Sequence, residues 1–284
     1  MQAPALMQSP ISIADYQRAN AGPRPLKWME VWGGNERGEC AFSVPGIDAW
    51  ITSLPFEESN RGGDLNYVSI AGAGQISRFA IVDISGHGAS VGESATRLRR
   101  LMRKHINMSD QTRFARAINQ EFSRLDSAGC FATALFVTYF TATDHLIICN
   151  AGHPKPLWYH AQTRTWELLD HDIPVQAGGP LNLPLGVIEP TDYVEFAVAL
   201  GRGDVILMYT DSLIEATNTN NEPLGEDGLL TLVRELDRRE PARLNCLLLD
   251  AVARFRGGIP AKDDQTLMVL HHTGALAFQQ PTVK

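Results

Sequence analysis

Apolar runs along the middle of the chain predict β-strands. The segments 67–73 and 78–83 flank a Gly-Ala-Gly turn and are expected to lie side by side as neighbouring strands. The runs 131–140 and 145–152 are apolar on both faces and are separated by a Thr-Asp turn, which is typical of a hairpin of central strands. Further strands are predicted at 193–200, 205–211 and 266–272.

Helical periodicity occurs in two separate places. Apolar residues recur at a spacing near 3.6 over 91–106 and again over 114–125, which predicts a first pair of helices. A second pair is predicted over 225–238 and 241–255. Because the helices come in pairs and do not alternate strictly with strands, we expect an α+β fold in which two sheets pack face to face with the helix pairs outside.

The composition narrows the class of protein and of partner. The chain has 284 residues and a formal net charge of -7, which argues against nonspecific nucleic-acid binding and against an anionic membrane surface. No stretch approaches the roughly 20 apolar residues of a membrane helix, and the first residues lack the pattern of a signal peptide. We therefore expect a cytoplasmic protein without nucleic-acid or membrane partners. The cysteines are interpreted as reduced, buried thiols: Cys40, Cys130, Cys149 and Cys246.

Aspartates occupy the ends of several predicted strands. Asp64 precedes a strand, Asp83 ends one, Asp211 ends another, and the pair at 263–264 begins the last. Strand ends of two packed sheets can converge on one rim, where neighbouring carboxylates repel each other and raise one another's pKa values. A divalent cation removes that cost, and an all-oxygen site suits Mg²⁺ or Mn²⁺ better than Zn²⁺. Two such ions can activate a water for attack on a phosphoester.

The same aspartates have a plainer interpretation. Asp is common in turns and at helix caps, so each of these residues, taken singly, also fits a purely structural role. Asp144 and Asp204, which lie between predicted strands, are interpreted as turn residues. The spacing along the chain does not show that the other aspartates meet.

Six short segments occur in a fixed order over roughly residues 45 to 272. Together they resemble the PPM group (type 2C) of metal-dependent Ser/Thr protein phosphatases and, more narrowly, its bacterial SpoIIE-like branch. The resemblance implies an α-β-β-α sandwich of two mainly antiparallel sheets flanked by helix pairs. The segments are GGD at 62–64, DISGHG at 83–88, NAGHPKPLWY at 150–159, LPLGV at 183–187, YTDSLIEA at 209–216 and DDQTLMVL at 263–270.

The resemblance also implies a centre of two Mn²⁺ or Mg²⁺ ions. Asp64 and Asp83 would be the catalytic carboxylates, Asp83 bridging the ions, and a hydroxide generated there would attack phosphorus in line without a cysteine nucleophile. Asp264 would lie next to the metal ligands without itself binding an ion. The implied metal ligands are Asp64, Asp83, the carbonyl oxygen of Ile84, Asp211 and Asp263.

The chain departs from the family pattern at a few positions. Ser212 stands where most relatives have Gly, and no acidic residue follows closely after Asp64. His87 lies four residues after Asp83 rather than two, and Arg61 is the one candidate for a phosphate-binding arginine. These departures keep open a second hypothesis, a pseudophosphatase that binds phosphoproteins without turnover. A third is a phosphoesterase that acts on a small molecule.

The expected organisation is a phosphatase domain over 45–274, preceded by an N-terminal extension (1–44) packed on it and followed by a tail (275–284). The expected substrate is phosphoserine or phosphothreonine on a bacterial regulatory protein in signal transduction, an anti-sigma-factor antagonist being one candidate. His153 either protonates the leaving group or, the stronger interpretation, fixes its loop. The basic residues within 91–106 form either a solvated face or a docking surface for an acidic protein substrate.

Overall fold

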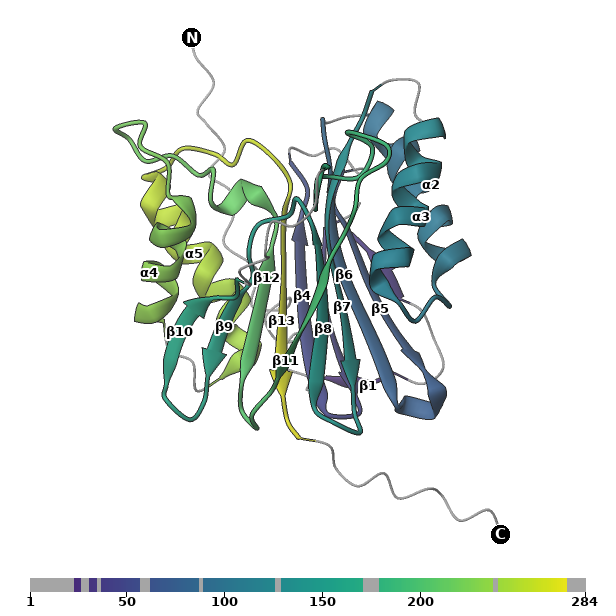
Figure 1. Ribbon diagram of the computed structural model, residues 1–284. Helices are drawn as coiled ribbons and strands as arrows, with labels where there is room; N and C mark the ends of the chain where they lie inside the picture. The colour runs from purple at the N-terminus through teal and green to yellow at the C-terminus, as the bar shows by residue number, and fades with distance from the viewer. Residues whose placement is uncertain are drawn as a thin grey trace.

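Two β-sheets pack face to face between two pairs of helices (Figure 1). This architecture confirms the predicted α+β sandwich of mainly antiparallel sheets. The computed structural model describes residues 23–26, 31–34, 37–56, 62–86, 89–125, 129–170, 179–236 and 240–274.

The first sheet contains seven of the described strands, and all neighbours in it are antiparallel except the pair β1 and β3. Its order is β1 (Arg24–Pro25), β3 (Gly38–Val44), β4 (Ile47–Leu54), β13 (Gln265–His272), β12 (Val205–Tyr209), β9 (Leu157–His160) and β10 (Thr165–Leu168).

The second sheet contains six described strands and is antiparallel throughout. Its order is β11 (Glu195–Ala199), β8 (His145–Ala151), β7 (Ala132–Phe140), β6 (Ile76–Ile84), β5 (Leu65–Ala71) and β2 (Val31–Gly33).

Helix pairs cover the outer faces of the sandwich (Figure 1). One pair is α2 (Ala89–His105) with α3 (Gln111–Leu125), and the other is α4 (Gly225–Glu235) with α5 (Leu244–Arg256). The short 3₁₀ helices are η1 (Gly72–Gly74), η2 (Asp211–Leu213) and η3 (Pro241–Arg243). No helix in the described part of the chain is long and apolar enough to span a membrane.

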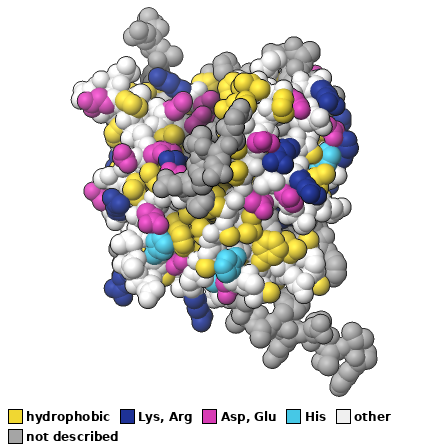
Figure 2. All heavy atoms as spheres, in the orientation of Figure 1, with side chains coloured by type: hydrophobic (Ala, Val, Ile, Leu, Met, Phe, Trp, Pro, Cys, Tyr) yellow, Lys and Arg dark blue, Asp and Glu magenta, His cyan; other side chains and the backbone are white. Residues whose placement is uncertain are grey.

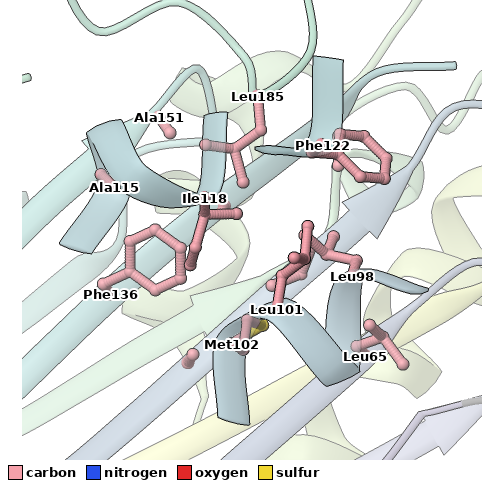
Figure 3. Close-up of a cluster of buried hydrophobic side chains, with 14 of the residues drawn as sticks. Leu65, Leu98, Leu101, Met102, Ala115, Ile118, Phe122, Phe136, Ala151 and Leu185 are labelled. Atoms are coloured by element: carbon pink, nitrogen blue, oxygen red, sulfur yellow. The ribbon is translucent and has the colours of Figure 1, made fainter. Parts of the chain in front are cut away.

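Buried apolar side chains form three layers, one between each two neighbouring layers of the α-β-β-α sandwich. In the outer layer drawn in Figure 3, Leu98, Ile118 and Phe122 of the α2–α3 pair lie together with Leu65 and Phe136 of the second sheet. The middle layer fills the space between the sheets, and the third joins the first sheet to α4 and α5. The central strands are therefore apolar on both faces, which is why they read as continuous apolar runs.

Most predicted elements are present with small shifts at their ends. The strand predicted over 205–211 ends at Tyr209, because Asp211 already begins η2. The helix predicted from residue 241 begins as the 3₁₀ turn η3 and becomes α-helical at Leu244. The strands β1, β2, β3, β4, β9 and β10 were not predicted. The β3–β4 hairpin spans the boundary predicted between residues 44 and 45, because β3 precedes it and β4 follows it. The predicted domain limits stay predictions.

Asp204 does more than the turn role predicted for it. Its carboxylate, in a side chain that is only 5% exposed, accepts hydrogen bonds from the backbone N–H groups of Ala161 (2.8 Å) and Gly201 (2.9 Å) and from Nε1 of Trp158 (3.2 Å). It thereby ties the β9–β10 turn to the turn before β12. Asp144 also bonds beyond its turn, accepting from His272 Nε2 at 2.9 Å.

We expect Asp204→Ala to lower the free energy of unfolding by about 2–3 kcal/mol, because it leaves three partly buried donors without their acceptor. Urea denaturation followed by circular dichroism measures the change. The exposed Asp250→Ala on α5 is the matched control and should stay within about 0.5 kcal/mol of wild type. Equal stability of the two variants would contradict this account of Asp204.

Candidate metal centre

Asp64 lies where the two sheets meet. It immediately precedes β5, its side chain is 1% exposed, and its Oδ2 accepts a hydrogen bond from Oγ1 of Thr210 at 3.1 Å. Thr210 follows β12 of the opposite sheet, and its Oγ1 in turn accepts from the backbone N–H of Thr266 on β13 at 3.0 Å. The bond therefore fixes the carboxylate of one sheet against the strand ends of the other.

The second oxygen of Asp64 is chemically open. Oδ1 is buried and has no hydrogen-bond partner among the described atoms. Burial raises the pKa of this carboxyl well above its ordinary range, the bonds to Thr266 and Thr210 oppose the rise, and the charges of Asp264 and Asp263 add to it. A buried carboxylate oxygen without a donor is costly, and a hard cation is the partner that relieves that cost.

Asp83 is the second-to-last residue of β6 and lies opposite Thr133 of β7. Burial, followed by the charges of Asp64 and Asp211, raises the pKa of Asp83 to about 10. Groups that raise one another's pKa in this way lie close together. The structure therefore brings Asp64, Asp83 and Asp211 to one rim, which the spacing along the chain left open.

Asp211 and Asp263 approach the same point from the first sheet. Asp211 begins η2 directly after β12, and Asp263 lies two residues before β13. Both charges, after burial itself, raise the pKa of Glu215. Glu215 was not among the predicted site residues, although its position in YTDSLIEA, four residues after Asp211, places it one helical turn away.

Close backbone packing shapes the rim beside Asp64. A Cβ on Gly63 would lie 2.8 Å from the carbonyl oxygen of Ile84, and a Cβ on Gly62 would lie 2.2 Å from Oδ2 of Asp264. Asp264 accepts hydrogen bonds from the backbone N–H groups of Gly63 (2.5 Å) and Phe56 (2.6 Å). Its two oxygens are thus used to hold the loop that carries Asp64, while the Ile84 carbonyl lies beside that loop.

Ser212 fits its position without backbone strain. Its φ is not among the positive values found at non-glycine residues of the described chain, so the glycine of most relatives is not required here by conformation. Nη2 of Arg256, a buried residue of α5, donates to the carbonyl oxygen of Ser212 at 3.3 Å. Arg256 therefore supports the turn that begins at Asp211, a role that the sequence did not reveal.

His153 is buried beside this rim. Its Nδ1 lies 2.8 Å from Oγ1 of Thr133, the residue opposite Asp83, and Asn150 closes the loop by accepting from the His153 N–H at 2.7 Å. Burial lowers the pKa of the imidazole to about 3. The ring is therefore neutral at neutral pH, which favours the predicted loop-fixing role over proton donation.

The carboxylates converge without forming a closed cage. Among the residues that the structure describes, no group of three or more His, Cys, Asp or Glu side chains stands ready to hold an ion. The donor chemistry nevertheless fits Mg²⁺ or Mn²⁺, since it consists of carboxylates and a backbone carbonyl, with the Asp64 Oδ1 still lacking a partner. Arg61 and His87 lie outside the described residues.

The family model for Stage II sporulation protein E (SpoIIE) matches residues 74–273. The chain belongs to the SpoIIE family. This SpoIIE-family chain matches no curated protein sequence. The match to the SpoIIE family model confirms the resemblance to the SpoIIE-like branch that was inferred from six short segments.

Solved structures show where the same fold occurs. The RsbU and RsbW domains of a Mycobacterium tuberculosis protein align with a TM-score of 0.65 at 24% identity, over 82% of this SpoIIE-family chain and 63% of that one. The chain thus spans less than two thirds of that relative. The PP2C phosphatase domain and a regulatory fragment of Bacillus subtilis SpoIIE align with a TM-score of 0.60 at 18% identity, over 86% and 64% of the two chains.

A third neighbour contains metal. The catalytic domain of the serine/threonine protein phosphatase PstP, solved in complex with two manganese ions, aligns with a TM-score of 0.53 at 15% identity, over 79% of this chain and 97% of that one. At these identities the likeness establishes the fold, which is the PP2C-type sandwich.

Replacing Asp83 by Asn should stabilise the metal-free protein at neutral pH. The folded-state pKa of Asp83, about 10, lies above the ordinary value, so ionisation of this carboxyl costs folding free energy once pH exceeds about 4, and the cost grows until about pH 10. In EDTA at pH 8 we expect the free energy of unfolding of Asp83→Asn to exceed that of wild type by at least about 1 kcal/mol. The difference should vanish near pH 4.

Manganese should reverse that order. Saturating Mn²⁺ is expected to stabilise wild type by about 2–3 kcal/mol at one hundred times its dissociation constant and Asp83→Asn much less. Thermal denaturation with and without Mn²⁺ provides the measurement, with Asp250→Asn as the control carboxylate. A wild-type melting temperature unmoved by Mn²⁺ would count against a metal centre at this rim.

Proposed function

We propose that this SpoIIE-family chain is a metal-dependent protein phosphatase that hydrolyses phosphoserine or phosphothreonine. The observation that carries the proposal is that the carboxylates of Asp64 and Asp211, which come from the ends of two different sheets, both act on Asp83 and raise its pKa, together with burial, to about 10. The PP2C-type fold supports it, as do neighbours of that fold solved with magnesium (RsbX) and with two manganese ions (PstP).

In this proposal the rim binds two Mn²⁺ or Mg²⁺ ions, through the ligands Asp64, Asp83, the Ile84 carbonyl, Asp211 and Asp263. When bound, the ions would supply an acidified water and neutralise charge on the phosphoryl oxygens. Asp64, held by Thr210, and Asp83, on which the charges of Asp64 and Asp211 act, are the proposed catalytic carboxylates. Their fixed positions would orient the phosphoryl group for in-line attack.

The chain's own residues define the rest of the proposed site. Asp264 holds the Gly63 backbone, and Gly63 lets the loop that carries Asp64 pack closely against the carbonyl oxygen of Ile84. The buried, neutral His153 would keep the loop beside Asp83 in place rather than move a proton. The expectation that all four cysteines are buried is wrong for Cys40, Cys130 and Cys246, which are partly exposed; only Cys149 is buried. Burial is nevertheless the first cause that raises the pKa of Cys40, Cys149 and Cys246, which disfavours a thiolate nucleophile at these positions.

The proposed substrate is a phosphorylated regulatory protein in the cytoplasm, and an anti-sigma-factor antagonist is the candidate that the family resemblance offers. A second candidate function is phosphoprotein binding without turnover. It is favoured by the missing acid after Asp64 and by the absence of a closed ligand cage among the described residues. Ser212 was one reason to consider this second function, but its backbone conformation is ordinary and no longer supports it.

Purified protein with Mn²⁺ should hydrolyse p-nitrophenyl phosphate and a phosphoserine peptide, and EDTA should abolish both activities. We expect Asp83→Asn to lower kcat by more than about 100-fold, since it removes a carboxylate that would hold the ions, a loss of several kcal/mol of transition-state stabilisation. Asp250→Asn should retain full activity. If wild type binds Mn²⁺ in calorimetry yet hydrolyses neither compound, phosphoprotein binding becomes the better description.

His153→Gln should leave the shape of the pH–rate profile unchanged between about pH 6 and 9, because a group with a pKa of about 3 does not titrate there. The free energy of unfolding of the variant should instead be about 1–2 kcal/mol lower than that of wild type, since the substitution breaks the contact with Thr133. Loss of the alkaline limb of the wild-type profile in His153→Gln would restore the imidazole as the proton donor.

A further inference from the structure

Four large hydrophobic side chains are exposed on the described surface: Phe131 (41%), Val187 (46%), Ile188 (45%) and Met108 (38%). The first three, which we call the apolar knob, lie together, whereas Met108 follows α2 at the turn into α3. Clusters of this kind on an otherwise polar surface mark sites of protein interaction.

Backbone hydrogen bonds hold the knob in shape. Ala132 and Leu185 exchange both of their backbone bonds, at 2.8 and 2.7 Å, which sets Phe131 opposite the segment 186–188. Asn119 of α3 clamps that segment by accepting from the Gly186 N–H (2.8 Å) and donating to the Ile188 carbonyl (2.9 Å). The apolar side chains are thus presented by a rigid support, which lowers the entropic cost of binding a partner.

The knob is attached directly to the candidate metal centre. The N–H of Ser85 donates to the Phe131 carbonyl at 2.9 Å, and the Phe131 N–H donates to Oγ of Ser85 at 3.0 Å. Ser85 is two residues beyond Asp83, a separation of at most about 7 Å along the chain. An extended peptide with its phosphoserine at the rim would therefore place a side chain three or four residues away on the knob.

The helices beside the knob have the opposite charge to the chain as a whole. Residues 89–125 contain eight Lys and Arg but three Asp and Glu, in a chain whose net charge is -7. Figure 2 shows dark blue Lys and Arg side chains along the right-hand side of the molecule, where Figure 1 places α2 and α3. Arg124, exposed in the last turn of α3, lies two residues beyond Phe122, over which the Gly186 backbone packs.

We propose that the apolar knob and the adjoining Arg124 of α3 form a docking surface for the substrate, an acidic protein segment with an apolar side chain three or four residues from its phosphoserine. The inference rests on the proposed phosphatase function for the phosphoserine and on the charge of α2–α3 for the acidic character. The apolar side chain covers the knob, and a carboxylate of the segment faces Arg124. The chain's overall negative charge disfavours an anionic membrane as the occupant.

The test uses full-length protein and a fluorescent phosphoserine peptide that contains Leu three residues from the phosphoserine and four Glu residues around it. Fluorescence anisotropy gives its dissociation constant. We expect Phe131→Ser and the double variant Val187→Ser/Ile188→Ser to raise it about 5- to 10-fold, since each loses roughly 1 kcal/mol of apolar burial. Arg124→Glu should raise it by a similar factor at low salt and less at 0.5 M NaCl.

Matched controls lie elsewhere on the surface. Met108→Ser removes an equally exposed apolar side chain, and Arg202→Glu reverses an exposed charge in the turn between β11 and β12; both should bind the peptide as wild type does. A second peptide with Ser in place of Leu should bind wild type and the knob variants alike.

Turnover is followed separately with p-nitrophenyl phosphate, which is too small to reach the knob. The knob variants should hydrolyse it at the wild-type rate while KM for the peptide rises. If wild type fails to hydrolyse p-nitrophenyl phosphate, the proposed function fails, yet the anisotropy series still decides the docking surface. Equal peptide affinity in wild type and knob variants would overturn it. So would knob variants that lose binding to phosphatidylglycerol vesicles but keep peptide binding.

Discussion

Mutual repulsion among carboxylates buried at the junction of two sheets is the constraint on which the candidate centre depends. Burial together with the charges of Asp64 and Asp211 raises the pKa of Asp83 to about 10. In the absence of a cation this arrangement opposes folding. In the proposed function, a hard divalent cation would remove the repulsion and give the buried oxygens a partner.

The sandwich makes the arrangement possible through its antiparallel strand ends. The start of β5 and the end of β6 are neighbours in one sheet, and the end of β12 and the start of β13 are neighbours in the other. The bond from Thr210 to Asp64 then joins the two pairs of ends across the sheets. Rigid apolar layers on both sides of each sheet hold these ends in position, and the rim itself carries the polar groups.

The same rim connects the proposed chemistry to the outer surface. Ser85 leaves β6 just beyond Asp83 and is bonded twice to Phe131, whose side chain is exposed at the apolar knob. Asn119 links the knob in turn to the basic helix α3. A partner that touches the knob would thus contact a rigid extension of the loop next to the proposed metal ligands, which couples substrate docking to the position of Asp83 without a separate moving element.

The sequence by itself determined the α+β class, the strand and helix pairs of the centre of the chain, and the family, because apolar periodicity and short ordered motifs are local properties of the chain. It did not reveal β9 and β10, which are only four residues long at a sheet edge, or the hairpin of β3 with β4. Only the tertiary structure decided that Asp64, Asp83 and Asp211 share one rim and that Asp204 is a buried acceptor. It alone also brought Glu215, Arg256 and Thr210 to the site. Those roles arise from contacts between residues up to 146 positions apart, as for Thr210 with Asp64, and the spacing of residues along a chain carries no information about such distances until the sheets are packed.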